Sequence, residues 1–207
     1  MTDAADTPAP RTLLQALEAM ANEAGPDGYT LEQIFDRLDE RAFGAALFIL
    51  ALPCCIPFLY IVPQIVAVPM AALAVQMALG RAEPWLPARL AERRIDKAGL
   101  TRTAQGGRKF FGWVEAIARP RLTFLTGPKS ERLIGLLLCV FSASIMLPFP
   151  LTNTVPGFAV AGAAFGLMAR DGILVALSCL LGAAWVGVLI AGFVFGVGLA
   201  AGALTGG

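Results

Sequence analysis

Three long apolar runs dominate the chain, and charged side chains lie only before or between them. Residues 43–79, 133–169 and 172–207 contain no Asp, Glu, Lys or Arg. Each run exceeds the roughly 20 residues that a helix needs to cross the hydrocarbon core of a bilayer. The pattern therefore predicts an all-α, polytopic integral membrane protein with a C-terminal transmembrane segment.

The first two runs repeat one order of parts. Each follows a Glu-Arg-x-x-Gly sequence and is then interrupted by a Pro-Phe pair and a Val-Pro pair. The first unit has Glu40-Arg41-x-x-Gly44, Pro57-Phe58 and Val62-Pro63, and the second has Glu131-Arg132-x-x-Gly135, Pro148-Phe149 and Val155-Pro156. Matching interruptions in two halves of a membrane chain indicate a central site in transporter-like folds.

Proline determines the expected shape of each unit. An interior proline removes a backbone donor and clashes with the preceding turn, so Pro57, Pro63, Pro148 and Pro156 are predicted to break the helices. Each unit is then either a full helical hairpin or one crossing with a re-entrant loop. Hairpins would make the repeats parallel, with both Glu-Arg pairs on one side, and re-entrant loops would invert them. The charge distribution favours the parallel arrangement.

The chain divides into five parts. They are an acidic tail with a short amphipathic helix at 1–28, the first repeat unit at 29–80, a basic connector at 81–130, the second repeat unit at 131–171 and a Gly-rich membrane segment at 172–207. Thr30 and Gln33 have the spacing of a capping box, which predicts the start of a second amphipathic helix. The last segment fits either one long helix or two short ones.

Charge is uneven along the chain although the net charge is only +1. Residues 1–41 hold nine acids and three basic residues, whereas residues 81–132 hold twelve basic residues and five acids. Because Lys and Arg beside membrane segments stay in the cytoplasm, the connector is predicted to lie on the cytoplasmic side of the membrane. It also suits contact with anionic lipid headgroups. We expect no nucleic-acid partner, since no binding motif accompanies the basic residues.

Uncharged polar side chains inside the apolar runs are the first candidates for substrate binding. Thr152, Asn153 and Thr154 follow the Pro-Phe pair of the second unit, and Gln64 is the strong amide of the first. These groups donate and accept hydrogen bonds, which suits a hydroxyl-bearing group or a partly hydrated ion. The alternative is that they cap helices or form a turn.

The arginines of the repeated Glu-Arg pairs are the second candidates. Arg41 and Arg132 could attract an anionic headgroup or phosphate at the cytoplasmic face. Their alternative role is to anchor the starts of helices by pairing with Glu40 and Glu131.

The remaining chemistry argues against an enzyme. The chain has no His, and its four Cys lie inside apolar runs without metal or disulfide spacing. The adjacent Cys54 and Cys55 admit a redox interpretation, but packing is favoured. The sequence Thr126-Gly127-Pro128-Lys129-Ser130 lacks the earlier Gly of a phosphate loop. We expect no catalytic residues, no metal and no cofactor.

Several motifs resemble the ExoD family, which is named for bacterial exopolysaccharide synthesis. They are Gly80-Arg81-x-x-Pro84-Trp85-Leu86-Pro87, Arg119-Pro120-Arg121-Leu122, Thr126-Gly127-Pro128 and Glu131-Arg132. The resemblance runs from about Tyr29 to about residue 190. It implies a multi-pass protein of the bacterial inner membrane, linked to surface polysaccharide production and tolerance of alkaline conditions. No catalytic residues can be carried over from it.

Two functions follow as alternatives. In the first, the two units form a transporter-like protein that handles a lipid-linked or ionic substrate. In the second, the protein is a non-transporting membrane scaffold for polysaccharide machinery. The expected partners are membrane lipids, polysaccharide-synthesis proteins or lipid-linked intermediates, and a second copy of the chain.

Overall fold

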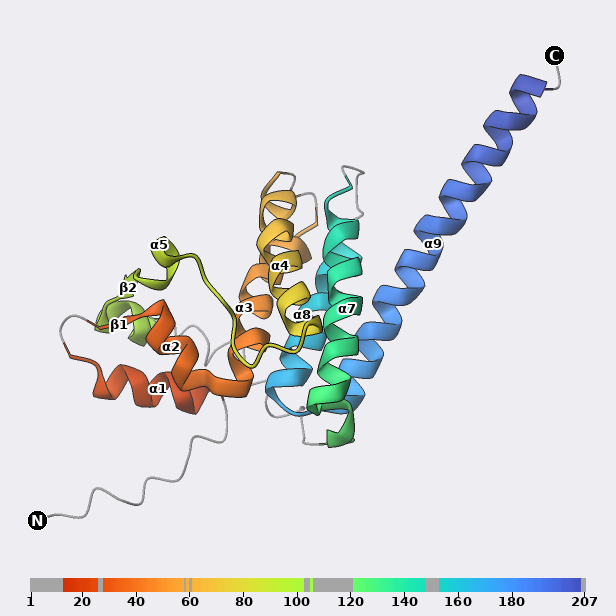
Figure 1. The fold of residues 1–207 in the computed structure, drawn as a ribbon. Coiled ribbons are helices and arrows are strands. Elements are labelled where there is room, and N and C mark those ends of the chain that lie inside the picture. The colour runs from red at the N-terminus through yellow and green to blue at the C-terminus, as the bar shows by residue number, and fades with distance from the viewer. Residues whose placement is uncertain are drawn as a thin grey trace, which may run out of the picture.

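A bundle of four helices lies between a small N-terminal subdomain and one long C-terminal helix (Figure 1). This computed structural model describes residues 13–25, 28–57, 59, 61–102, 105, 121–147 and 153–205. Within these ranges the chain is mostly helical, which confirms the all-α prediction. The number of membrane crossings stays a prediction.

The four helices of the bundle come from the two repeat units. The first unit forms α3 (Ala42–Ala51), the 3-10 helix η2 (Leu52–Cys55) and α4 (Val62–Ala78). The second unit forms α7 (Pro128–Ile145) and α8 (Thr154–Met168). Each unit is thus a pair of helices that end and begin on either side of a predicted break.

The first helix of each unit packs on the second helix of the other unit. α3 contacts α8, and α7 contacts α4, more extensively than the helices within a unit contact each other. A Cβ at Gly44 would lie 2.9 Å from the carbonyl oxygen of Ala164, and a Cβ at Gly135 would lie 2.6 Å from the backbone nitrogen of Ala78. Each crossing joins the start of one helix to the end of another. The two repeats are therefore parallel.

Two of the four prolines predicted to break helices lie instead at helix starts. Pro57 lies in the break after η2, whereas Pro63 and Pro156 lie in the first turns of α4 and α8. A proline in the first turn removes an N–H that has no intrahelical partner. Pro63 and Pro156 therefore start helices and do not interrupt them, while α4 continues past its interior Pro69. Pro148 lies outside the described residues.

The N-terminal subdomain combines residues 13–38, from the acidic part of the chain, with residues 88–95 of the basic connector. It therefore includes the start of the segment that was predicted to be the first repeat unit. Its elements are α1 (Leu13–Glu23), β1 (Tyr29–Thr30), α2 (Leu31–Leu38), α5 (Ala88–Ala91) and β2 (Arg94–Ile95). β1 and β2 pair antiparallel. The capping box is confirmed, because the Gln33 N–H donates to Thr30 Oγ1 and the Thr30 N–H donates to Gln33 Oε1. The 3-10 helix η1 (Asp39–Arg41) leads into α3.

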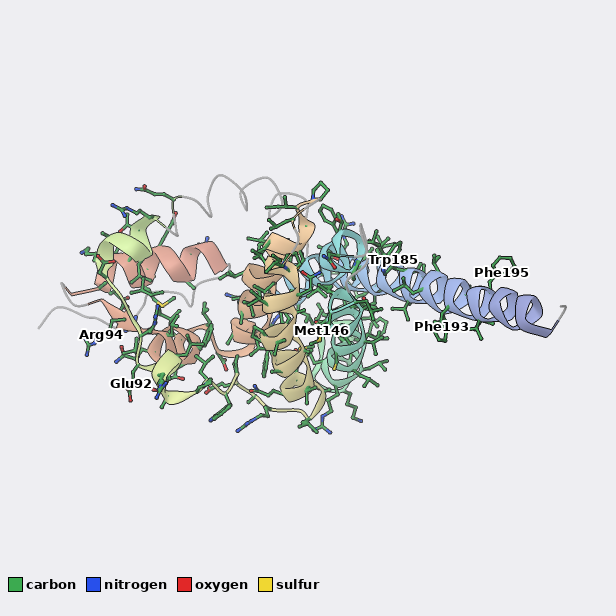
Figure 2. All side chains as sticks on the ribbon, turned by 90° about the horizontal axis from the view of Figure 1, so that it is seen from above. Glu92, Arg94, Met146, Trp185, Phe193 and Phe195 are labelled. Carbon is green, nitrogen blue, oxygen red and sulfur yellow. The ribbon has the colours of Figure 1, made fainter. Side chains whose placement is uncertain are left out.

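Helix α9 (Gly172–Thr205) is one continuous helix of 34 residues. The first part of α9 packs on α8, on α7 and on the short 3-10 helix η3 (Thr123–Thr126), which precedes α7 in the chain. Further along, Gly187 and Gly192 have nothing within 4 Å of an added Cβ, and Phe193 is 73% exposed. Figure 2 shows Phe193 and Phe195 projecting from opposite sides of this extension.

Gly135→Ala should destabilise the bundle, because its new Cβ would lie 2.6 Å from the backbone nitrogen of Ala78. Overpacking of this kind costs about 1–3 kcal/mol, so we expect the melting temperature in detergent to fall by about 3–10 °C. Gly192→Ala is the matched control, since its Cβ meets nothing within 4 Å. Equal melting temperatures for the two variants would contradict the close crossing of α7 and α4.

Candidate functional site

A cavity of about 540 Å³ lies where the helix ends of both repeat units meet. Its walls come from the segments around the start of α3, the end of α4, η3 with the start of α7, and the end of α8. We call it the charged-end cavity, because its lining includes five charged residues: Asp39, Arg81, Glu131, Arg132 and Arg170. Residues 42–80 and 133–169 carry no charge, so the rest of the bundle contributes none.

Arg132 lies across the end of α4. A Cβ at Gly80 would be 2.5 Å from Nε and 2.7 Å from Nη2 of Arg132. Gly80 has a φ of +77°, and its N–H donates to Met77 O at 2.9 Å while the Arg81 N–H donates to Gln76 O at 3.2 Å. This Schellman pattern ends the helix. The guanidinium thus lies at the carbonyl end of α4, where the helix dipole stabilises a cation.

The corresponding end of α8 has the same backbone pattern but a different residue. Arg170 occupies the position of Gly80, with matching hydrogen bonds and a φ of +52°. The end of α8 therefore has a side chain at the position that glycine leaves open at the end of α4. Arg41 is half-buried and does not line the cavity. The two Glu-Arg pairs therefore have different surroundings.

Asp171 holds the turn between α8 and α9. Its carboxylate Oδ1 accepts hydrogen bonds from the N–H groups of Ile173 at 3.1 Å and Leu174 at 3.2 Å. The Gly172 N–H donates to Arg121 O at 2.7 Å. Asp171 thereby caps α9, and the turn is attached to the segment that leads into η3.

The loop after α4 is fixed by Gln76. The Trp85 N–H donates to Gln76 Oε1 at 2.6 Å, and Gln76 Nε2 donates to Trp85 O at 3.3 Å.

A second cavity, of about 480 Å³, also has Arg81 in its lining. We call it the subdomain groove; it lies between α2, this loop and α5, and its acidic lining residues are Glu32, Asp36, Glu83 and Glu92.

The amides predicted to bind substrate lie at the opposite, uncharged end of the bundle. Gln64 is in the first turn of α4, about 24 Å along the helix from Gly80 at a rise of about 1.5 Å per residue. Asn153 directly precedes α8, is 4% exposed and makes no side-chain cap. Asn153 Oδ1 and Gln64 Oε1 are buried without a hydrogen-bond partner among the described residues. The candidate residues therefore form two separate groups.

Two further buried polar atoms, and the two threonine candidates, lie elsewhere in the chain. Ser142 Oγ in α7 and Trp185 Nε1 in α9 are also buried without a partner in the described part of the chain. Thr154 is the first residue of α8 and is half-buried. Thr152 lies outside the described residues. Unpaired buried polar atoms are rare in folded proteins, so these positions are candidates for contact with a substrate or water.

Asp39, Arg81 and Arg170 were not predicted from the sequence to be parts of a site. The missing information was the pairing of α3 with α8 and of α7 with α4, which brings them together. A signal was present, however, because charged residues border both charge-free runs on each side. In two parallel hairpins, these borders must all lie at one end.

The cysteines lie inside the bundle and α9 as free thiols. Cys54 is fully buried, and its backbone and Cβ lie against Gly157 at the start of α8. Among the residues that the structure describes, no three His, Cys, Asp or Glu side chains gather where they could hold a metal ion.

Comparison with known proteins gives consistent matches. The family described as "Exopolysaccharide synthesis, ExoD" matches residues 13–191. Protein ExoD of Rhizobium meliloti (strain 1021) is 32% identical over 173 residues, covering 80% of this chain and 71% of that protein. An uncharacterized protein of Synechocystis sp. is 30% identical over 148 residues, covering 70% of this chain and 69% of that protein. No solved structure matches.

Asp171→Ala should destabilise the α8–α9 turn by about 0.5–2 kcal/mol, the usual cost of losing an N-cap. Asp171→Asn keeps an oxygen that can accept from the Ile173 and Leu174 N–H groups, so it should retain most of the stability. Melting temperatures of the purified variants in detergent measure the difference. If Asn is as destabilising as Ala, the charge of Asp171 matters and the cap does not.

Proposed function

Because the chain belongs to the ExoD family, whose description is exopolysaccharide synthesis, we propose that it supports this process from the bacterial inner membrane. In this proposal the four-helix bundle is embedded in the bilayer and handles a lipid-linked or ionic substrate. The protein performs no catalytic step. An ionic substrate would connect it to alkaline tolerance, and a lipid-linked one would connect it directly to polysaccharide synthesis.

The apolar surface of the bundle supports a membrane location. Large apolar side chains are exposed on every bundle helix and on α9, among them Ile49, Ile65, Leu136, Phe158 and Leu180. Residues 172–198 of α9 are long and apolar enough to cross a membrane, and α9 is the one helix in the described part of the chain that meets both criteria. In water this exposed surface would be unfavourable, whereas lipid tails would cover it.

The charged end of the bundle supports an orientation. Arg81, Arg132 and Arg170 lie at this end, and the segments that connect α3 to α4 and α7 to α8, residues 56–61 and 146–153, have no charged residue. Basic residues beside membrane segments remain in the cytoplasm. We therefore place the charged-end cavity and the N-terminal subdomain on the cytoplasmic side.

The observation that carries the handling function is the unpaired oxygen of Asn153. An amide oxygen buried in an apolar bundle loses its hydrogen bonds to water, at a cost of about 1–3 kcal/mol, unless a partner replaces them. Asn153 Oδ1 has no such partner among the described residues, and Gln64 Oε1 at the same end has none either. A substrate with hydroxyl groups, or a partly hydrated ion, would supply the missing hydrogen bonds.

The N-terminal subdomain favours the alternative function, a membrane scaffold. It stands beside the bundle (Figure 1), and Figure 2 shows Glu92 and Arg94 on its surface. The subdomain groove of about 480 Å³ combines acidic residues with Phe35 and the exposed Trp85. Aromatic residues are enriched at protein interfaces, so this surface suits a polysaccharide-synthesis protein.

Replacing both Gln64 and Asn153 by Leu should abolish polysaccharide production in a deletion strain while leaving the protein level normal. Leu removes the amide oxygens but keeps the apolar packing. Production is measured as cell-surface polysaccharide, and protein level by immunoblot of membranes. Ile65→Leu, next to Gln64 and 65% exposed, is the matched control and should behave like wild type.

The same variant separates the two functions. A double Leu variant with normal protein level and normal polysaccharide would refute substrate handling by these amides. The scaffold function would then be the better account, since it does not depend on polar groups inside the bundle.

A further inference from the structure

Two arginines of the charged-end cavity, Arg81 and Arg132, are available to a ligand. Arg81 and Arg132 are exposed to solvent, and neither has an ion pair within the described ranges. With Arg170 they make three arginines in the lining, which also includes the acidic residues Asp39 and Glu131. The lining therefore carries a net positive charge, and a volume of about 540 Å³ is that of a small-molecule site.

The first turn of α7 adds backbone donors to this wall. Gly127 just before this turn, Glu131 in it and Arg132 just after it line the cavity. Gly127 makes no side-chain cap, and Pro128 has no N–H. The Lys129 and Ser130 N–H groups precede the first N–H that can bond within the helix, that of Glu131. Such N–H groups and the helix dipole favour an anion at this end.

Several residues with a strained backbone conformation lie in or next to the lining of the same cavity. Four non-glycine residues within the described ranges have a positive φ: Asp39, Ile61, Leu122 and Arg170. Asp39 and Arg170 line the cavity, and Leu122 directly precedes the lining residue Thr123. Strain of this kind persists where the surrounding structure holds it, and it clusters at ligand sites. This observation is independent of the charges.

From these observations we propose that the charged-end cavity binds a phosphate or diphosphate group. The inference rests on the proposed function, which it deepens by naming the recognised part of the substrate. Arg132 and Arg81 donate to the phosphate oxygens, since a guanidinium matches phosphate geometry with two parallel hydrogen bonds. The first turn of α7 receives the remaining negative charge. The phosphate belongs either to a lipid headgroup or to a free phosphate compound.

The asymmetry of the two repeats explains why one such site forms. Gly80 leaves room for the Arg132 guanidinium at the end of α4, and its φ of +77° is easy for glycine alone. At the matching position of the second unit stands Arg170, which is itself a lining residue of the cavity. The repeat thus provides one shared cavity between the units, with arginines from both.

Titration calorimetry of the full chain in neutral detergent with inorganic diphosphate tests the site. Arg132→Gln removes one cavity guanidinium, and we expect its dissociation constant to rise about tenfold or more. Arg94→Gln removes an equal charge from an exposed residue of β2 that does not line the cavity, and should change affinity less than about twofold. Absence of binding by the wild type, or equal losses in the two variants, would overturn the proposal.

A second variant guards against misfolding. If Arg132→Gln lowers the melting temperature, Arg81→Gln replaces it, because Arg81 lies outside the helices and should be removable without loss of stability. Normal diphosphate affinity in a folded Arg81→Gln variant and a folded Arg132→Gln variant would also overturn the site.

Nanodiscs distinguish the two sources of the phosphate. Diphosphate affinity is compared in phosphatidylcholine discs, in discs with added phosphatidic acid, and in discs with added oleate, which is anionic but has no phosphate. Competition by phosphatidic acid beyond that of oleate assigns the site to a lipid headgroup. Equal affinities in the last two assign it to a free phosphate compound.

Complementation separates this inference from the proposed function. An Arg132→Gln variant that loses diphosphate binding but restores polysaccharide production would support the existence of the phosphate site. It would refute a role of that site in polysaccharide synthesis. Loss of both would support the two together. A variant that keeps diphosphate binding refutes the site alone, since Asn153 and Gln64 test the proposed function independently.

Discussion

The packing of α3 on α8 and of α7 on α4 is the contact on which the rest of the structure depends. Gly44 and Gly135 allow it, because any side chain at these positions would meet the backbone of the facing helix. Each glycine lies three residues after the arginine of its Glu-Arg pair. The close crossings therefore bring both pairs to one end of the bundle. The charged-end cavity exists because four helix ends converge there.

Local features of this fold were predictable from the sequence. Thr30 and Gln33 predicted a capping box because its residues and spacing are specific. The breaks between α3 and α4 and between α7 and α8 followed from proline. The exact role of Pro63 and Pro156 did not, since the same missing N–H that breaks a helix interior is harmless in a first turn. The repeat indicated two related units but not which helices would pair.

Long-range features were not predictable in the same way. The pairing of β1 with β2 joins Tyr29 to Ile95, and two-residue strands leave no periodic pattern. Arg81 and Arg170 appeared as ordinary border charges until the helix crossings placed them in one cavity. Asn153 was recognised as a candidate, but it does not cap α8, because its backbone is helical, with φ −87° and ψ −33°, and capping residues are usually extended. Packing between distant segments decided the first two of these cases.

The two ends of the bundle have opposite chemistry, which gives the proposed function a direction. One end gathers arginines around an open cavity, and the other buries uncharged amides among apolar residues. A bilayer would separate these environments by most of its hydrocarbon thickness, since α4 and α7 measure about 25–27 Å at 1.5 Å per residue. In the proposed function, the charged end binds a headgroup or phosphate, and the amides at the other end bind hydroxyl groups or an ion.

Labelling of single cysteines from each side of the membrane tests the central claim, that the bundle is embedded with its charged end in the cytoplasm. Lys129→Cys and Met146→Cys, at the charged and uncharged ends, are made in a chain without its four natural cysteines. An impermeant thiol reagent should label the cysteine at 129 in inverted vesicles and not in intact cells. The cysteine at 146 should be protected in inverted vesicles. Labelling at 129 from outside intact cells, or of both positions in inverted vesicles, would contradict the account.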